Sequence, residues 1–191
     1  MRNHPEGIAP SVRNILNYKK SGTVLDLGSG KGRHAIFLAK QGFAVTAVDY
    51  VEERLAEMKA RARIEGVRIS IKRADISHFS FSRKYDIIMA SMSLHFLQKN
   101  QIAQVVKRMK AHTKQGGLNV VSVLTNKEEM KANRAYLFKT SELKRYYTDW
   151  NILEYEEKLS QPFFSEKQGK RIRQHRAVII ASKPPYPSNV R

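Results

Sequence analysis

Three glycines spaced by single residues, Gly28, Gly30 and Gly32, follow the apolar run Val24–Leu27. A helix-like apolar pattern begins directly after them, at Ala35. Glycines at such a turn let the backbone approach a ligand that a Cβ atom would exclude, and the helix that follows offers unpaired N–H groups at its first turn. The spacing therefore predicts a ligand-binding loop between a strand and a helix.

The spacing of these glycines differs from that of a dinucleotide-binding loop. Such a loop has glycines at its first, third and sixth positions, and Arg33 occupies the sixth position here. Two carboxylates accompany the loop instead: Asp26 lies two residues before it, and Asp49 ends the next apolar run. A carboxylate after a second strand can accept hydrogen bonds from both hydroxyls of a ribose. The alternative is an ordinary strand-to-helix turn in which Asp49 caps the next helix.

The first 124 residues alternate apolar runs with amphipathic stretches. Ser11 is expected to cap a short helix, and Asp49 with Glu52 matches the capping box of a later helix. The expected strands are 23–27, 44–48, 67–71, 85–90 and 118–124. This alternation predicts a doubly wound α/β sheet, with the ligand crevice at the carboxyl ends of its central strands.

The pattern changes after residue 124. Residues 125–139 are polar and are expected to form a loop, and a short helix is expected at 141–147. Strands are expected at 150–155 and 177–181, with no helix between them. Two such strands form a hairpin, which predicts a seven-stranded sheet with a reversed C-terminal edge strand. We expect one domain over 1–183, with a helical lead-in at 1–20 and an extended tail at 184–191.

The composition of the 191-residue chain is that of an ordinary globular protein, except for its net charge of +18. Such an excess favours polyanions or acidic surfaces, but the charge is dispersed along the chain and is also typical of a solvated basic surface. The chain has no cysteine, which excludes disulfides and thiolate chemistry. Its six histidines show no metal-ligand spacing, so no metal is expected. The N-terminus does not resemble a signal peptide, and we expect a cytoplasmic protein with no membrane association.

The loop with its two carboxylates resembles the cofactor loop of class I methyltransferases that use S-adenosylmethionine (SAM). Over its whole length the chain is most similar to the tellurite-resistance (TehB-like) small methyltransferases. The matching strings are Leu25-Asp-Leu-Gly-Ser-Gly-Lys-Gly-Arg-His34, Ser91–Leu97, Phe138–Trp150 and Arg171–Lys183. Ser29 replaces a cysteine that is frequent in this family, which is an exchange of one small residue for another.

The resemblance implies that the chain binds SAM and releases S-adenosylhomocysteine (SAH). By it, Asp49 binds the ribose, Asp75 accepts the adenine amino group and the Ile76 N–H bonds a ring nitrogen. Tyr50 would lie against the adenine face or would pack structurally. The full set of expected cofactor-binding residues is Asp26, Gly28, Ser29, Gly30, Gly32, Arg33, Asp49, Tyr50, Asp75, Ile76 and Ser91.

The segment Ser91–Leu97 is expected beside the methionine end of the cofactor. Enzymes that methylate amino groups of nucleic acids have an Asp/Asn-Pro-Pro-aromatic motif there, and this chain does not, which disfavours that chemistry. The expected catalytic residues are His95, His175 and Arg176, although packing roles for the two histidines remain alternatives. Arg176 or Arg33 could hold an anion by a bidentate contact.

These observations favour a SAM-dependent methyltransferase whose acceptor is a small, anionic or soft nucleophile. Two alternatives stay open: a methyltransferase of RNA or another polyanion that uses the basic surface, and a SAM-binding module without catalysis. A nicotinamide-dependent enzyme is disfavoured by the missing sixth-position glycine and by the expected terminal hairpin.

Overall fold

A computed structural model describes residues 7–126, 136–160, 163–165 and 169–185. The helices are α1 (Pro10–Tyr18), α2 (Arg33–Lys40), α3 (Glu52–Ile64), the 3₁₀ turn η1 (Leu94–Phe96), α4 (Lys99–His112) and α5 (Glu142–Arg145). The strands are β1 (Thr23–Leu27), β2 (Ala44–Asp49), β3 (Ile69–Arg73), β4 (Tyr85–Ser91), β5 (Thr113–Leu124), β6 (Asn151–Leu159), β7 (Phe163–Ser165), β8 (Lys170–Ile172) and β9 (His175–Ser182).

Seven of these strands form one sheet in the order β3-β2-β1-β4-β5-β9-β6. The pairs from β3 to β5 are parallel, whereas β9 runs antiparallel to both β5 and β6. The predicted doubly wound, seven-stranded sheet with a reversed C-terminal strand is therefore confirmed. The reversed strand β9 lies one position inside the sheet, and β6 forms the edge beside it.

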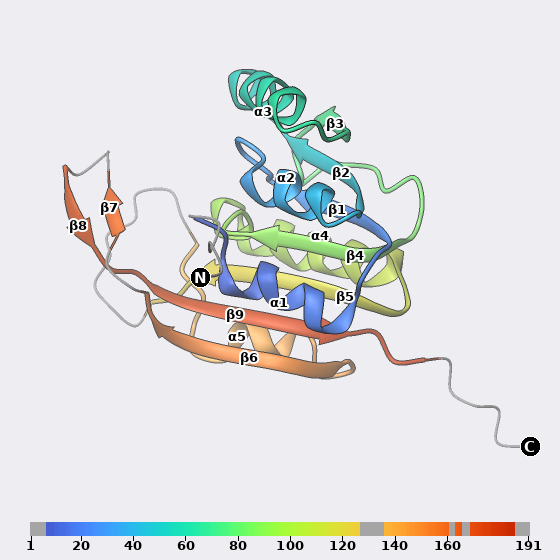
Figure 1. The fold of residues 1–191 in the computed structure, drawn as a ribbon. Coiled ribbons are helices and arrows are strands. Elements are labelled where there is room, and N and C mark those ends of the chain that lie inside the picture. The colour runs from blue at the N-terminus through green and yellow to red at the C-terminus, as the bar shows by residue number, and fades with distance from the viewer. Residues whose placement is uncertain (1–6, 127–135, 161–162, 166–168, 186–191) are drawn as a thin grey trace, which may run out of the picture.

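Helices cover both faces of the sheet and bury one core on each side. The first core packs α4 and α5 against one face, and its centre includes Ile88, Val105 and Tyr147. The second core packs α1, α2 and α3 against the other face, around residues such as Ile15, Leu38 and Met58. In Figure 1, α1 crosses in front of β5 and β9 while α4 lies behind the sheet. Both faces of the central strands are thus removed from water, as their continuous apolar runs predict.

Several expected element ends are wrong. The first helix begins at Pro10 with Ala9 as its N-cap, so Ser11 does not cap it; proline is well suited to the first helical position because it has no N–H to satisfy. The N-cap of α3 is Val51, so Asp49 and Glu52 form no capping box. The third strand is displaced by two residues, to Ile69–Arg73. The stretch 160–175 contains a small additional hairpin, β7–β8.

The carboxyl ends of the parallel strands lie at the left of Figure 1, and the β7–β8 hairpin projects on that side. The loops after β1, β2 and β4 therefore meet at this edge of the sheet. Part of the loop expected at 125–139 and part of the tail expected at 184–191 lie outside the described residues. None of the helices in the described part of the chain has the length and apolar content that crossing a bilayer requires.

A cofactor crevice and a cationic cluster at the carboxyl edge

The glycine loop has a left-handed backbone at each of its three glycines, and two of them also make close contacts. The backbone φ is +73° at Gly28 and +74° at Gly32, a region that side chains disfavour. A Cβ atom at Gly28 would lie 2.4 Å from the Cβ of Ser93, and one at Gly32 would lie 2.2 Å from the Cγ of Met58. The loop consequently packs directly on the segment after β4 and on α3. At Gly30 the φ is +55°, although a Cβ there would meet nothing within 4 Å.

Asp49 ties the loop to the end of β2. Its Oδ2 accepts a hydrogen bond from the Gly30 N–H at 2.8 Å, and its Oδ1 accepts one from the Val51 N–H at 3.0 Å. Each carboxylate oxygen can accept more than one hydrogen bond. The buried Asp49 carboxylate therefore orders the loop and keeps acceptor capacity toward the cavity that it lines.

Asp75 forms a second ordered acid, after β3. Its Oδ1 accepts hydrogen bonds from the Ser77 N–H at 2.8 Å and from the Ser77 hydroxyl at 2.7 Å. The bond from the Ser77 side chain is the main cause that lowers the pKa of Asp75 below its ordinary value. Asp75 thus stays ionised and turns the chain so that the buried Ile76 follows it along the same cavity wall.

Two adjoining cavities lie at this edge and share Gly28 and Arg54. The first, the loop cavity, has a volume of about 390 Å³ and is lined by Asp26, Gly28, Ser29, Gly30, Lys31, Arg33, His34, Arg54, Arg61 and Ser91. The second, the strand-end cavity, has a volume of about 410 Å³ and is lined by Gly28, Asp49, Tyr50, Arg54, Asp75, Ile76, Met92, Ser93, Phe96 and Leu97. All the expected cofactor-binding residues except Gly32 line one of the two. Gly32 instead begins α2 as its N-cap.

The cavities also contain residues that the sequence did not single out individually, chiefly Arg54 and Phe96. Phe96 follows β4 and Tyr50 follows β2, and both side chains are well exposed, at 69% and 67%. Their exposure at the mouth of the same cavity suits contact with a planar ligand. Phe96 could have been found from the sequence, because it lies in the segment Ser91–Leu97 that was expected beside the cofactor. Arg54 could not, because nothing in the sequence distinguishes it from other arginines on a helix surface.

Polar atoms are buried without protein partners beside the loop. Asp26 Oδ2, Ser29 Oγ and His95 Nδ1 have no hydrogen-bond partner among the residues that the structure describes. Burial, and next the negative charge of Asp49, raise the pKa of Asp26 to about 7, and Arg33 opposes this shift. Buried polar groups left in this way usually await water or a ligand. The strand end therefore has the character of a binding site.

Arg176 is electrostatically coupled to both Arg33 and His95. Burial and the nearby charge of Arg33 lower the pKa of Arg176. Burial, and next the charge of Arg176, lower the pKa of His95 to about 4, so its imidazole is neutral at neutral pH. The predicted residues Arg33, Arg176 and His95 are thus brought together. Their two guanidinium groups form a positively charged region beside the neutral imidazole.

Comparison with known proteins gives a consistent result. The family model of the tellurite resistance protein TehB matches residues 6–180. A probable SAM-dependent methyltransferase TehB of Haemophilus influenzae is 32% identical over 162 residues, which are 84% of this chain and 57% of that protein. The chain belongs to the TehB family. The Haemophilus TehB relative is named as a SAM-dependent methyltransferase, and this chain has the fold of the TehB crystal structure.

Solved structures agree with this TehB assignment. The crystal structure of TehB from Haemophilus influenzae matches with a TM-score of 0.86 and 29% identity, over 94% of this chain and 63% of that chain. Magnesium protoporphyrin IX methyltransferase from Synechocystis, solved with bound SAM, shares the fold at a TM-score of 0.69 and 17% identity, over 91% and 76% of the two chains. The chain spans a little over half the length of the curated TehB relative.

His175 occupies a different place from the other expected TehB acceptor-side residues. It begins β9 at the carboxyl edge, and its Nδ1 lies 2.6 Å from the hydroxyl oxygen of the buried Thr125. Side chains alternate between the faces of a strand, so His175 and its neighbour Arg176 point to opposite faces of the sheet. His175 lines neither cavity, and the same holds for His95 and Arg176, so Arg33 is the one acceptor-side candidate among the cavity-lining residues. In the described part of the chain, no group of three His, Asp or Glu residues is arranged to hold a metal ion.

Proposed function

We propose that this TehB-family chain transfers the methyl group of SAM to a small, anionic or soft nucleophilic acceptor and releases SAH. The meeting of the two cavities at Gly28 is the main support for this proposal. Asp49 and Asp75 line the strand-end cavity, whereas Lys31, Arg33 and Arg61 line the loop cavity alone and Arg54 lines both. A nucleoside in the first cavity and an anion in the second would therefore meet at Gly28.

The strand-end cavity would hold the adenosyl part of SAM. Asp49 would accept the ribose hydroxyls with the acceptor capacity that the Gly30 and Val51 N–H groups leave. Asp75 has both of its hydrogen bonds on Oδ1, so its other oxygen is suited to the adenine amino group. In the loop cavity, the unpartnered Oδ2 of Asp26 would face the cofactor ammonium. When bound, SAM supplies an electrophilic methyl group on a positively charged sulfur.

Methyl transfer from a sulfonium is an in-line displacement. A lone pair of the acceptor forms a bond to the methyl carbon while the carbon–sulfur bond breaks and its electron pair goes to the sulfur. An acceptor that is already anionic has no proton to lose, so no general base is required. We infer that Arg33 and Arg176 position such an anion by charge-assisted hydrogen bonds and that the neutral His95 lies beside it.

Calorimetry with SAH tests the cofactor half of this proposal. Asp49→Ala should weaken binding by about 1–3 kcal/mol, because charge-assisted hydrogen bonds are lost. Glu52→Gln is the matched control: Glu52 lies three residues later, is exposed and pairs with Arg73, and it lines neither cavity. Its affinity for SAH should equal that of the wild type. Equal affinity of Asp49→Ala and the wild type would refute the ribose assignment.

A screen of methyl acceptors tests the other half. Tellurite, selenite, a small thiol and bulk RNA would each be incubated with labelled SAM, and the wild type would be compared with Arg176→Gln. We expect transfer to a small anionic or thiol acceptor, and at least a tenfold loss of kcat/KM in the variant. Incorporation of labelled methyl groups into RNA alone would show that the acceptor is a polyanion and not a small molecule. SAH binding with no transfer to any acceptor would instead indicate a SAM-binding module.

A further inference from the structure

The loop cavity extends past the glycine loop onto α3, where it becomes strongly basic. Lys31 on the loop, Arg33 at the start of α2, and Arg54 and Arg61 on α3 all line it, and we call these four residues the basic groove. Arg54 and Arg61 are seven residues apart, so they lie on one face of α3, separated by about 10 Å along the helix axis. The groove is therefore longer than a single small anion.

The charge of the basic groove does not match the charge of the cofactor. SAM carries a sulfonium and an ammonium against a single carboxylate, so its net charge is positive. Asp26 is the only acid among the described residues that line this cavity, and four permanently cationic side chains accompany it. Binding a cation beside four cations is unfavourable. The single carboxylate of SAM cannot match four cations, so the surplus positive charge is available to a second, anionic ligand.

Intramolecular ion pairs do not use up this surplus. Lys31 pairs with Glu57 at 2.8 Å, but both side chains are largely exposed. Among the described residues, neither Arg54 nor Arg61 forms an ion pair. Other cations around α3 do have acidic partners: Arg73 pairs with Glu52, and Lys40 pairs with Glu65. Within the described part of the chain, Arg54 and Arg61 thus have no acid within ion-pair distance, although the charge of Arg61 helps to lower the pKa of Glu65, and both are available for an external anion.

We propose that the basic groove binds a phosphate group carried by the methyl acceptor, with Arg54 and Arg61 as its principal contacts. This inference rests on the proposed function. It assumes that the anionic acceptor binds near Arg33 and that its phosphate group lies farther along α3. Guanidinium groups bind phosphate bidentately, which suits two arginines on one helix face. The phosphate belongs either to a small phosphorylated molecule or to the backbone of a nucleic acid, and the two sources predict different responses to salt.

The test compares two double variants of α3. Arg54→Gln/Arg61→Gln removes two charges from the basic groove, and Lys59→Gln/Arg63→Gln removes two charges from exposed positions of the same helix that line neither cavity. Glutamine keeps the helix propensity of both pairs close to that of the wild type. The probes are inorganic pyrophosphate and a twelve-nucleotide single-stranded RNA, each titrated into protein saturated with SAH.

We expect the groove variant to bind pyrophosphate at least tenfold more weakly than the wild type, and the control variant to bind it within about twofold. If nucleic acid is the source, the groove variant should also lower the slope of log K against log salt for the RNA by about 1.4, the value for two lost phosphate contacts on a single strand. An unchanged RNA slope together with the loss of pyrophosphate binding identifies a small phosphorylated acceptor.

Two results would contradict the proposal that the basic groove binds phosphate. The first is an equal loss of pyrophosphate affinity in both double variants, which would indicate diffuse surface charge. The second is no binding of pyrophosphate by the wild type. Binding of SAH to the wild type is measured first. Failure at that step refutes the proposed function itself, whereas failure with pyrophosphate after normal SAH binding refutes only the groove.

Discussion

The two ends of the central sheet treat buried polar groups in opposite ways. At the carboxyl edge, Asp26 Oδ2, Ser29 Oγ and His95 Nδ1 are buried without partners among the described residues. At the amino edge, the side chains of Asn119 and Tyr147 are fully buried and hydrogen-bonded to each other at 3.1 Å. Because an unsatisfied buried group costs stability, the first arrangement persists where a ligand is to supply the partners. The second arrangement is structural.

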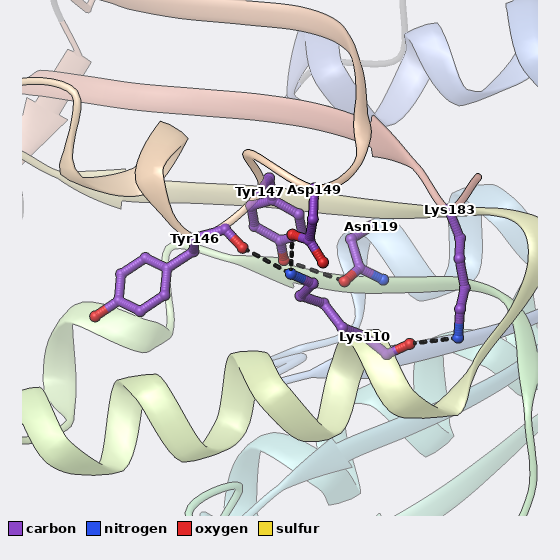
Figure 2. A network of polar contacts seen from close by, with 6 residues as sticks. All are labelled: Lys110, Asn119, Tyr146, Tyr147, Asp149 and Lys183. Atoms are coloured by element: carbon purple, nitrogen blue, oxygen red, sulfur yellow. Dashed lines mark hydrogen bonds and ion pairs between the residues drawn. The ribbon is translucent and has the colours of Figure 1, made fainter.

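Figure 2 shows the polar contacts at the amino edge. The amide of Asn119 accepts from the Tyr147 hydroxyl and donates to the Thr113 hydroxyl at 2.8 Å, which in turn donates to the Met109 carbonyl. Lys110 pairs with Asp149 and donates to the Tyr146 carbonyl at 3.0 Å. These contacts fasten α4 to β5 and to the turn before β6. The amino edge is thus a closed network that needs no ligand.

Asn119→Ala should produce the largest loss of stability. It leaves the Tyr147 hydroxyl buried without an acceptor and creates a small cavity, so we expect a loss of about 2–4 kcal/mol in the free energy of unfolding. Urea denaturation measures this loss, and calorimetry with SAH should show unchanged affinity. Adding Tyr147→Phe removes the stranded hydroxyl and should recover part of the loss. A weakened SAH affinity with normal stability would contradict the separation of the two edges.

Asp26→Asn should have the opposite effect on stability. The pKa of Asp26 rises from 3.8 to about 7 on folding, mainly through burial. The folded state therefore favours the protonated acid, and wild-type stability from this group is lost as pH rises from about 4 to 7. Asparagine does not ionise, so the free energy of unfolding of the variant should exceed that of the wild type by up to about 4 kcal/mol at pH 8, and by less near pH 4.

Cofactor affinity distinguishes this result from simple repacking. If Asp26 faces the cofactor ammonium, SAH affinity should fall at least tenfold in the more stable variant. Thermal unfolding at pH 4.5 and pH 8, with calorimetry on the same samples, measures both quantities. Higher stability with undiminished SAH affinity would show that the buried carboxyl is not held for the cofactor.

The sequence predicted the elements that position the site better than those at the sheet margins. The run 23–27 is mostly apolar and became β1 with the same bounds, because a strand buried on both faces has little choice of position. β3 lies at the edge, where its side chains are partly or fully exposed, and the expected 67–71 was displaced by two residues. The place of β9 between β5 and β6 depends on contacts distant in sequence, which local patterns do not encode.

Within the site, the residues of the glycine loop could be predicted from the sequence. The roles of residues that tertiary packing brings to the cavity could not. Asp49 could have been either a helix cap or a ligand for ribose. The structure shows that it caps no helix and instead holds the loop through Gly30. Arg54 and Arg61 resemble any exposed arginines on a polar helix. Only the packing of Gly32 on Met58, which brings the loop against α3, makes them part of the cavity.

Lys183→Met should give the smallest effect and sharpens the comparison at the amino edge. The Lys183 ammonium donates to the Lys110 carbonyl at 2.9 Å (Figure 2). It also donates to the Thr113 carbonyl at 3.0 Å, so it satisfies backbone groups at the end of α4. Methionine keeps the apolar stem and removes these bonds, which should cost about 1 kcal/mol. The matched control is Lys107→Met, an exposed position on the same helix that loses the same charge.

Urea denaturation of Lys183→Met and Lys107→Met separates two contributions to the free energy of unfolding. One is the loss of the hydrogen bonds to the carbonyl groups, and the other is the loss of a positive charge. Burial, and next the charges of Lys84 and Lys110, lower the pKa of Lys183. The folded-state pKa lies below the unfolded value, so the deprotonated amine is favoured on folding and the wild type should gain stability only at strongly alkaline pH. Near neutral pH the difference between the two variants should therefore be constant. Equal stability of the two variants would mean that solvent satisfies these carbonyls as well as Lys183 does, and the amino edge would then be less closed than its hydrogen bonds indicate.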